Sequence, residues 1–323
     1  MFCRWATPLA GHKLASAKEF SSFLAGQHAS PNDLQALFAN FSYFRLARNG
    51  ESQYSMARAS KVRRVRERHC ASKSLCSLGV RIPPFSSTSD PPPLFDGTTR
   101  LYTSYTCPYA QRVWIAMNYK GLQDKIELVP IDIRDMPAWY KEKVYPVNKV
   151  PSLEHNGKVL GESLDLIKYV DANFEGPPLV PADPAKKEFG EQLTSHIDSL
   201  MKDLYASFKG EDPVHKAGAS FDYLENALGK FDDGPFFLGQ FSFVDAAYAP
   251  FVERLEITFS EVYKNDITSG RSKLATYIEE LNKIDAYKTT KVDPQEFVEV
   301  FKKWLLVMYT QSKLISHFGV GAI

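Results

Sequence analysis

Apolar and polar positions along residues 96–176 follow two periods, and their order predicts a small unit that mixes strands and helices. An Asn-Gly pair at 156–157 predicts a hairpin turn into a returning strand. Runs rich in β-branched and aromatic residues are typical of strands and occur at 100–106, 126–133 and 150–155. Apolar residues at helical spacing predict helices at 108–120, 137–144 and 162–174.

The pattern changes after a Pro-rich segment at residues 175–184, which we interpret as a domain boundary. From 185 to 306 the apolar positions recur at helical spacing only. We therefore expect an α/β domain over residues 96–176, followed by an all-helical domain over residues 185–306.

Within the second domain, Ser242 and Asp245 predict the start of a helix. The Ser242 hydroxyl can accept a backbone N–H of the first turn, and the Asp245 carboxylate can reach back to the N–H of Ser242. Loss of such a cap costs on the order of 1 kcal/mol. This capping role accounts for Asp245, so we interpret it as a structural residue.

Composition adds a third region at the N-terminus. The net charge is +1, but residues 1–90 hold 13 Lys or Arg against 5 Asp or Glu, which leaves +8 there and −7 in the remainder. A basic, Ser-rich, acid-poor leader is typical of an organelle transit peptide. A solvated, disordered leader explains it equally well, so the expected location is the chloroplast or the cytoplasm. The basic run at 61–68 lacks aromatic or groove-binding motifs, and we expect no nucleic-acid partner.

Cysteine usage and hydropathy exclude further classes of protein. Of the four cysteines only Cys107 lies beyond the leader, so the folded part has no disulfide framework and suits a reducing compartment. Cys70 and Cys76 with His69 lack a second ligand pair at zinc spacing, and we expect no metal site. No apolar stretch is long enough to span a membrane. Polar residues interrupt the last candidate, 304–323, which predicts a short helix ahead of an atypical tail at 307–323.

Cys107 stands where the first predicted strand passes into the first predicted helix. Pro108 suits the first helical position, because its ring fixes φ and it has no N–H to leave unpaired. Cys107 therefore falls at the N-cap, where free N–H groups and the helix dipole are expected to lower its pKa by roughly one to several units. Ala110 occupies the place of a second cysteine, so an external thiol must complete a redox cycle. The alternative is an inert buried cysteine.

Pro151, at the start of the third predicted strand, suggests a cis peptide bond after Val150. The backbone of Val150 could then pair with an extended peptide ligand, as an added strand would. The alternative is an edge-strand proline that has no ligand role.

Glu162 and Ser163 begin the last predicted helix of the α/β unit. Free N–H groups at a helix start bind carboxylates, the Ser163 hydroxyl adds a donor, and Glu162 could hold an ammonium group. Together they fit the head of an α-amino acid. The alternative is plain helix capping, which Ser and Glu often provide.

These motifs recur in this order and spacing in the glutathione transferases. Residues 90–304 resemble the plant lambda class, with the omega and dehydroascorbate reductase classes more distant. The segments that carry the resemblance include RLYTSYTCPYAQRVW, VNKVPSLEHNGKVLGESLDL and FFLGQFSFVDAAYAPFVER. It implies the glutathione transferase fold, a thioredoxin-like N-terminal domain followed by an all-helical domain. Met136 stands where omega-type enzymes carry a Lys, which weakens an omega assignment and leaves the lambda one intact.

By this resemblance, Cys107 forms a mixed disulfide with the co-substrate glutathione and releases a reduced acceptor, a small aromatic or S-glutathionylated compound. The protein is then a monomeric thiol transferase with no membrane partner. The residues expected to bind glutathione are Tyr109 beside the nucleophile, Lys149 near the glycine carboxylate, Val150 with Pro151 along the cysteinyl backbone, and Glu162 and Ser163 at the γ-glutamyl head.

Two other functions remain compatible with the same residues. Dehydroascorbate reduction would use the same cysteine. A non-catalytic carrier of flavonoid-type ligands would need an aromatic pocket between the domains, for which the candidate lining residues are Trp139, Tyr140, Phe251 and Phe259.

Overall fold

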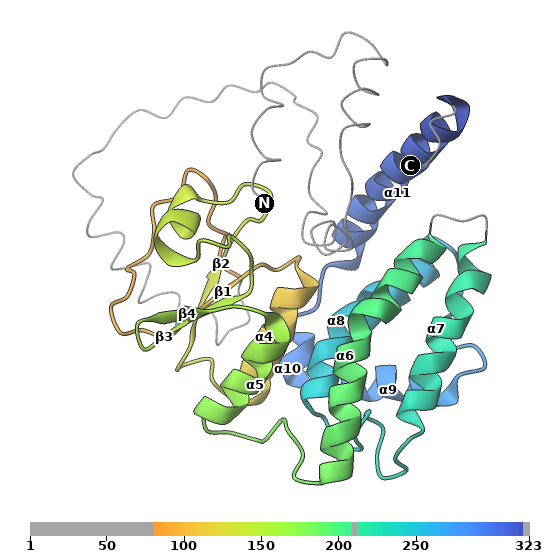
Figure 1. The fold of residues 1–323 in the computed structure, drawn as a ribbon, viewed down its shortest axis with the longest axis horizontal. Helices are drawn as coiled ribbons and strands as arrows, with labels where there is room; N and C mark the ends of the chain where they lie inside the picture. The colour runs from red at the N-terminus through yellow and green to blue at the C-terminus, as the bar shows by residue number, and fades with distance from the viewer. Residues whose placement is uncertain (1–80, 209–211, 319–323) are drawn as a thin grey trace.

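The computed structural model describes residues 81–208 and 212–318, which fold into two packed parts (Figure 1). One part is a sheet with helices between residues 100 and 173, and the other contains helices from residue 184 onward. This confirms the predicted succession of an α/β domain of the thioredoxin-like type and a helical domain.

The N-terminal part is built on a four-stranded sheet with the order β2-β1-β3-β4. β1 runs parallel to β2 and antiparallel to β3, which forms a hairpin with β4. The strands are β1 (Arg100–Thr103), β2 (Glu127–Pro130), β3 (Ser152–His155) and β4 (Lys158–Leu160). The first three are shorter than predicted: β1 and β2 end three residues before the predicted strands, and β3 begins only after Pro151.

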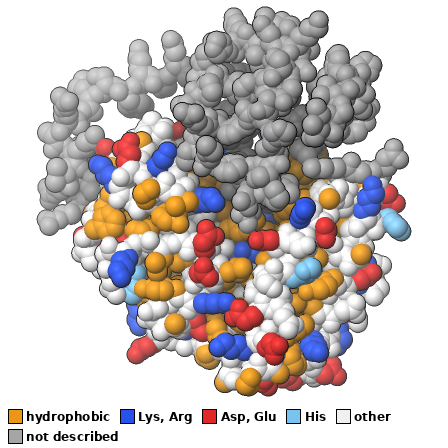
Figure 2. Space-filling model, viewed as in Figure 1, with side chains coloured by type: hydrophobic (Ala, Val, Ile, Leu, Met, Phe, Trp, Pro, Cys, Tyr) orange, Lys and Arg blue, Asp and Glu red, His pale blue; other side chains and the backbone are white. Residues whose placement is uncertain are grey.

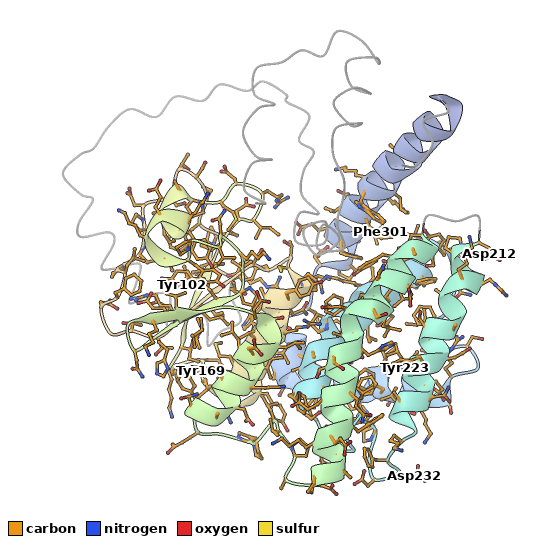
Figure 3. The ribbon with its side chains drawn as sticks, in the orientation of Figure 1. Tyr102, Tyr169, Asp212, Tyr223, Asp232 and Phe301 are labelled. Carbon is orange, nitrogen blue, oxygen red and sulfur yellow. The ribbon has the colours of Figure 1, made fainter. Side chains whose placement is uncertain are left out.

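Arg100 and Glu154 lie opposite each other on β1 and β3 and form a buried ion pair. Arg100 Nη1 and Glu154 Oε1 are 3.3 Å apart, and the Tyr102 hydroxyl donates to the other Glu154 oxygen at 2.7 Å. Tyr102 is labelled on the sheet in Figure 3. Because buried charges depend on their partners, this cluster helps to fix the register of β1 against β3.

Three helical segments accompany the sheet. α4 (Pro108–Tyr119) follows β1, α5 (Ser163–Asn173) follows β4, and the short π-helix η1 (Tyr140–Val144) precedes β3. α4 packs against α5 and, across the domain boundary, against α8 (Phe243–Glu261). The helix that begins after Cys107 therefore contacts both domains.

The C-terminal part packs around α8, which is buried continuously over residues 243–255. Its other helices are α6 (Pro184–Ser207), α7 (Pro213–Leu228), α9 (Ser272–Leu281), α10 (Asp285–Lys288) and α11 (Pro294–Phe318). The sequence predicts a short helix ahead of a tail at 307–323, but α11 is a single helix of 25 residues that extends beyond the other helices (Figure 1). That prediction is wrong because isolated polar residues do not end an amphipathic helix.

The predicted cap of α8 is confirmed. The Ser242 hydroxyl accepts the N–H of Val244 at 3.3 Å, and the Asp245 carboxylate accepts the N–H of Ser242 at 2.8 Å. Asp245 also accepts the Ser242 hydroxyl and the N–H of Phe237. One buried carboxylate thus joins the start of α8 to the loop before it.

Residues 81–94, which we call the N-terminal strap, contact both domains. Phe85 makes two backbone hydrogen bonds of 2.8 Å at the end of β2. The Arg81 guanidinium donates to the carbonyl of Lys291, in the helical domain, at 2.5 Å. The leader predicted to end at residue 90 therefore overlaps the folded part. Its basic run and its three cysteines lie in residues 1–80, outside the described residues.

Charged side chains of both signs are interspersed over the face that Figure 2 shows. No helix in the described ranges is long and apolar enough to cross a membrane. Within those ranges, no three His, Cys, Asp or Glu side chains gather as they would around a metal ion.

Candidate active site

Cys107 occupies its predicted position at the head of α4. It is the N-cap residue, Pro108 is the first helical residue, and the Cys107 carbonyl accepts the N–H of Gln111 at 3.0 Å. Its side chain makes no capping hydrogen bond and is fully buried. The place of the thiol on the helix is as predicted, whereas its depth below the surface is a new finding.

The surroundings of Cys107 do not produce the lowered pKa that its helix position predicts. Burial removes the water that would stabilise a thiolate, and this largest influence raises the pKa of the Cys107 thiol. The N–H groups of Ala110 and Tyr109 and the guanidinium groups of Arg254 and Arg112 act in the opposite direction. The helix start favours the thiolate, but desolvation outweighs it, so the prediction of a lowered pKa is wrong for this structure.

Val150 lies beside Cys107, as the second motif predicts. Its carbonyl oxygen is 3.9 Å from the Cys107 Sγ, and its peptide bond to Pro151 is cis. The Tyr140 hydroxyl donates to the carbonyl of Lys149 at 2.7 Å and so anchors the preceding residue. The structure therefore brings the thiol and the Val150 backbone together and leaves the Lys149 side chain exposed.

Glu162 and Ser163 begin α5, but the Glu162 side chain does not cap it. Glu162 is the N-cap residue with a φ of 63°, is exposed, and makes no capping hydrogen bond. The Ser163 hydroxyl is buried and accepts an N–H of Arg112 at 3.0 Å. Because a guanidinium only donates, the Ser163 hydroxyl keeps its own proton for another acceptor.

Arg112, one turn into α4, connects this helix with the start of α5. Its Nε donates to the Ala247 carbonyl at 2.9 Å, and its guanidinium carbon lies 5.0 and 4.7 Å from the ring centres of Tyr109 and Phe251. Its Nη2 is buried and has no hydrogen-bond partner within the described part of the chain. A buried guanidinium with an unused donor beside Ser163 suits an anionic ligand group.

Three buried polar residues at the domain boundary escaped the sequence analysis: Gln111 on α4, and Glu253 and Arg254 on α8. Arg254 donates to Gln111 Oε1 at 2.7 Å, and Gln111 donates to Glu253 Oε2 at 2.8 Å. In the sequence the two α8 residues look like the solvent face of a helix. The signal that could have found them is their position at the end of an apolar run, 243–252, that has no polar face apart from the capping Asp245.

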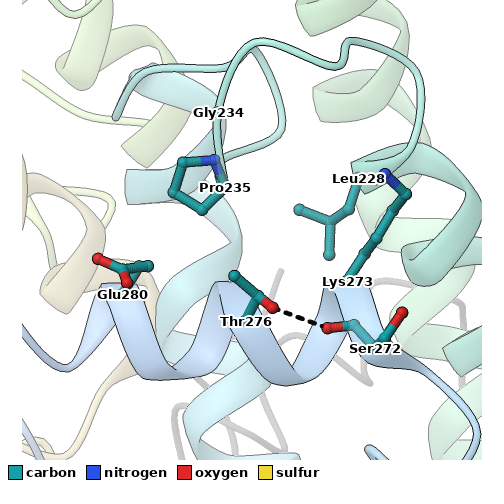
Figure 4. Close-up of a pocket in the computed structure, with 7 residues that line it drawn as sticks. All are labelled: Leu228, Gly234, Pro235, Ser272, Lys273, Thr276 and Glu280. Atoms are coloured by element: carbon teal, nitrogen blue, oxygen red, sulfur yellow. Dashed lines mark hydrogen bonds between the residues drawn. The ribbon is translucent and has the colours of Figure 1, made fainter.

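The aromatic residues considered for a ligand pocket separate into two groups. Trp139 and Tyr140 pack in the apolar cluster around the thiol, whereas Phe251 and Phe259 belong to the core of the helical domain. A small, mainly aromatic cavity lies where α8 meets α11, and its lining includes Phe251 and Arg254. A larger open pocket lies between α9 and the loop after α7, and none of the candidate site residues lines it (Figure 4).

Comparison with known proteins agrees with this fold. Residues 101–178 match the family description "Glutathione S-transferase, N-terminal domain", and residues 216–280 match "Glutathione S-transferase, C-terminal domain". The crystal structure of glutathione transferase Omega 1C from Trametes versicolor superposes with a TM-score of 0.57 at 26% identity. The match covers 66% of this chain and 98% of that chain.

Two relatives indicate to which class of glutathione transferases the chain belongs. Glutathione S-transferase L3 of Arabidopsis thaliana is 64% identical over 220 residues, which cover 68% of this chain and 93% of the relative. Glutathione S-transferase L2, chloroplastic, of the same plant is 60% identical over 223 residues, which cover 69% of this chain and 76% of the relative. The chain belongs to the glutathione transferase family, in its lambda class. Members of the family use glutathione, while the roles of the individual site residues stay predictions.

Proposed function

We propose that this glutathione transferase removes glutathione from S-glutathionylated acceptors, with the Cys107 thiolate as the nucleophile. The observation that carries the proposal is the position of the thiol, at the head of α4 with the Val150 carbonyl 3.9 Å from its sulfur. A nucleophilic sulfur there lies beside backbone that can hold a peptide ligand. Beyond the leader the chain has no second cysteine, so an external thiol has to resolve the mixed disulfide.

The reaction consists of two attacks on sulfur. In the first, the Cys107 thiolate attacks the glutathione sulfur of the adduct, a Cys107–glutathione disulfide forms, and the acceptor leaves with the bonding electron pair and takes up a proton. In the second, a glutathione thiolate attacks that disulfide, glutathione disulfide leaves, and the Cys107 thiolate is restored. Glutathione is thus the reductant and the acceptor is reduced.

The donors near α5 suit the γ-glutamyl head of glutathione. Ser163 would donate its hydroxyl proton to the α-carboxylate, with the unused Nη2 of Arg112 as a charged donor behind it. The exposed Glu162 carboxylate at the N-cap of α5 would hold the ammonium group. The acidic Glu162 and the basic Arg112, which donates to the next residue, Ser163, would match the two charges of an amino-acid head.

The remaining contacts follow the peptide toward its glycine end. The Val150 backbone, followed by the cis-linked Pro151, would pair with the cysteinyl residue. The exposed Lys149 would meet the glycine carboxylate, and the half-buried Tyr109 would add a backbone contact next to the sulfur.

The burial of Cys107 bears on how the reaction proceeds. A mixed disulfide is uncharged, whereas a thiolate in the same place is poorly solvated, so the site favours the disulfide. The guanidinium groups of Arg254 and Arg112 reduce the penalty on the thiolate. We therefore expect the Cys107–glutathione disulfide to accumulate when glutathione disulfide is the only reaction partner.

Intact mass measurement after treatment with glutathione disulfide tests the proposal. The parent protein should gain glutathione at Cys107, and Cys107→Ser should lose that adduct together with thiol transferase activity. The matched control replaces Cys3, Cys70 and Cys76 with Ser and should keep both. Full activity in Cys107→Ser would show that another group is the nucleophile.

The acceptor we propose is a small aromatic or S-glutathionylated compound, the class that the resemblance to lambda-class enzymes implies. The aromatic-lined cavity between α8 and α11 has a volume of only about 10 Å³, too small to hold such a compound in this conformation. Turnover of a mixed disulfide faster than of dehydroascorbate would support thiol transfer as the reaction, and the reverse order would favour a dehydroascorbate reductase. A carrier would bind an aromatic ligand equally well in the parent and in Cys107→Ser, and would turn over neither substrate.

We also propose that the basic leader directs the protein to the chloroplast, with the cytoplasm as the alternative. The relative named chloroplastic supports the first location. Import into isolated chloroplasts, followed by the mass of the imported product, tests it, and a full-length product left outside would favour the cytoplasm. The monomeric state we propose is tested by sedimentation of the purified protein.

A further inference from the structure

Arg254 reaches from the helical domain to the chain on both sides of Cys107. Its Nη2 donates to the carbonyl of Thr106, the residue before Cys107, at 3.1 Å. Its Nη1 donates to the side-chain oxygen of Gln111, one turn after Cys107, at 2.7 Å. The same Nη1 donates to the carbonyl of Pro250 on its own helix at 2.7 Å. One guanidinium therefore holds the strand-to-helix junction at two points.

Gln111 is held at both ends of its amide, so the second point is fixed in orientation. Its Nε2 donates to Glu253 at 2.8 Å and to the Thr290 hydroxyl at 3.3 Å, while its oxygen accepts from Arg254. Glu253 also accepts the N–H of Val292 at 3.0 Å. The helical domain thus determines where the first turn of α4 lies.

The positive charge of Arg254 is only partly neutralised by the nearest carboxylate, that of Glu253. The Arg254 side chain is 3% exposed, and the Glu253 carboxylate lies 3.8 Å away, a longer separation than its hydrogen bonds to Thr106 and Gln111. Charges act more strongly on each other where water is excluded. A buried cation held against the chain around Cys107 therefore stabilises negative charge on the sulfur.

We propose that Arg254 is a positioning residue for the Cys107 thiol, which it holds through Thr106 and Gln111 while its charge favours the thiolate. The inference rests on the proposed function, since it concerns the nucleophile of that reaction. Arg254 takes no part in bond making, and it acts through the two residues that flank the cysteine. The docking of the helical domain is thereby coupled to the reactivity of a thiol in the other domain.

Other ionisable groups lie around the thiol and the guanidinium. They are Arg112 and Tyr109 on α4, Tyr205 and Asp198 on α6, Glu253 on α8, and Tyr287 and Lys291 at and after α10. Burial raises the pKa of each of the three tyrosines, so they stay neutral at ordinary pH. Burial also raises the pKa of the Glu253 carboxyl, so the lower end of the titration is set at neutral pH. Because the pKa of the thiol is itself raised, the titration has to run from about pH 7 to well above the ordinary thiol pKa of about 8.5 to reach its midpoint.

The test is the pH profile of alkylation of Cys107 in the full-length protein, with peptide mass spectrometry to separate it from the other three thiols. Arg254→Gln should move the midpoint up by about one pH unit and slow labelling at neutral pH about tenfold, with recovery at alkaline pH. Turnover of a mixed disulfide should follow the same profile. Arg254→Lys keeps the positive charge but offers a single nitrogen to the two acceptors, the Thr106 carbonyl and the Gln111 side-chain oxygen. The midpoint of Cys107 alkylation should therefore move up by less than in Arg254→Gln.

Glu253→Gln should move the alkylation midpoint of Cys107 in the opposite direction. It removes the charge that opposes Arg254, so the midpoint should move down. The matched control is Asn118→Ala, which loses hydrogen bonds to the Ala286 carbonyl at 3.3 Å and the Thr289 hydroxyl at 3.0 Å, at the other end of α4. It loosens the same domain boundary away from Cys107 and should leave the midpoint in place.

An unmoved midpoint in Arg254→Gln overturns the inference, and so does an equal shift in Asn118→Ala. If Arg254→Gln does not fold, Arg254→Lys decides: an upward shift of the midpoint supports the role of Arg254, and an unmoved midpoint overturns it. The proposed function fails separately, when the parent protein forms no Cys107–glutathione adduct. If the Cys107–glutathione adduct forms but the alkylation midpoints of the variants do not move, only the proposed role of Arg254 is refuted.

Discussion

Asp245 allows a stability prediction to be worked out from the structure. Its buried carboxylate accepts the N–H groups of Ser242 and Phe237 and the Ser242 hydroxyl. Asp245→Ala removes these acceptors. The hydroxyl can rotate, but the two N–H groups are left buried and unpaired, at about 1–3 kcal/mol each. We expect the free energy of unfolding to fall by about 3 kcal/mol, more than the loss of a cap alone.

The same carboxyl makes stability depend on pH. Burial raises the pKa of Asp245 to about 7, against the effect of its hydrogen bonds. In the unfolded chain the carboxyl has an ordinary pKa of about 4, so between about pH 4 and pH 7 the folded protein holds a proton that the unfolded chain has lost. The contribution of this group to stability is greatest at low pH and falls by about 1.4 kcal/mol per pH unit as the pH rises through that window.

Asp245→Asn separates the two effects, because an amide keeps one acceptor oxygen but does not titrate. Urea unfolding of the parent and this variant at about pH 5 and about pH 6.5 should show their stability difference shifting by about 2 kcal/mol in favour of the variant at the higher pH. Titrations elsewhere in the chain cancel in this comparison. A difference that does not change with pH would refute the raised pKa. A loss below about 1 kcal/mol in Asp245→Ala would refute the cost assigned to the unpaired donors.

Three further replacements test a buried ion pair and the packing of two helices. Lys120→Met breaks a buried ion pair with Asp171 at 2.8 Å and leaves the carboxylate without its cation, so urea unfolding should show a loss of about 3–5 kcal/mol. A loss below about 1 kcal/mol would mean that the backbone donors to Asp171 suffice. Gly190→Ala would place a Cβ 2.6 Å from the Phe243 ring and should cost about 1–3 kcal/mol, whereas Gly218→Ala, with its nearest atom at 3.9 Å, should be neutral or stabilising. Equal effects of the two glycine replacements would contradict the packing explanation.

Features that depend on neighbouring residues were predictable from the sequence. Pro108 fixes the start of α4, and Ser242 with Asp245 fixes the start of α8, because a helix end is determined within one turn of chain. The extent of α11 was not predictable, because an amphipathic helix ends where its contacts or its caps end and isolated polar residues give no stop signal. The strand ends likewise depend on the position of partner strands.

The electrostatics of the candidate site depend on contacts that no local pattern contains. Arg254 and Gln111 are 143 positions apart in the chain, and only the packing of α8 on α4 brings them together. The burial of Cys107 has the same origin, since residues from distant segments enclose it. The position of a thiol at a helix start predicts that the helix lowers its pKa. Whether burial outweighs this effect depends on the residues that enclose the thiol, and these are known only from the whole fold.

The N-terminal strap has a consequence for how the leader can be removed. β2 is the outermost strand of its sheet, and Phe85 occupies part of its free side through two backbone hydrogen bonds. A bare strand of this kind is a template for pairing with another polypeptide. A processing protease that cut beyond Phe85 would uncover that strand and sever the tether from Arg81 to Lys291. A protein that began at or before residue 81 would keep both contacts.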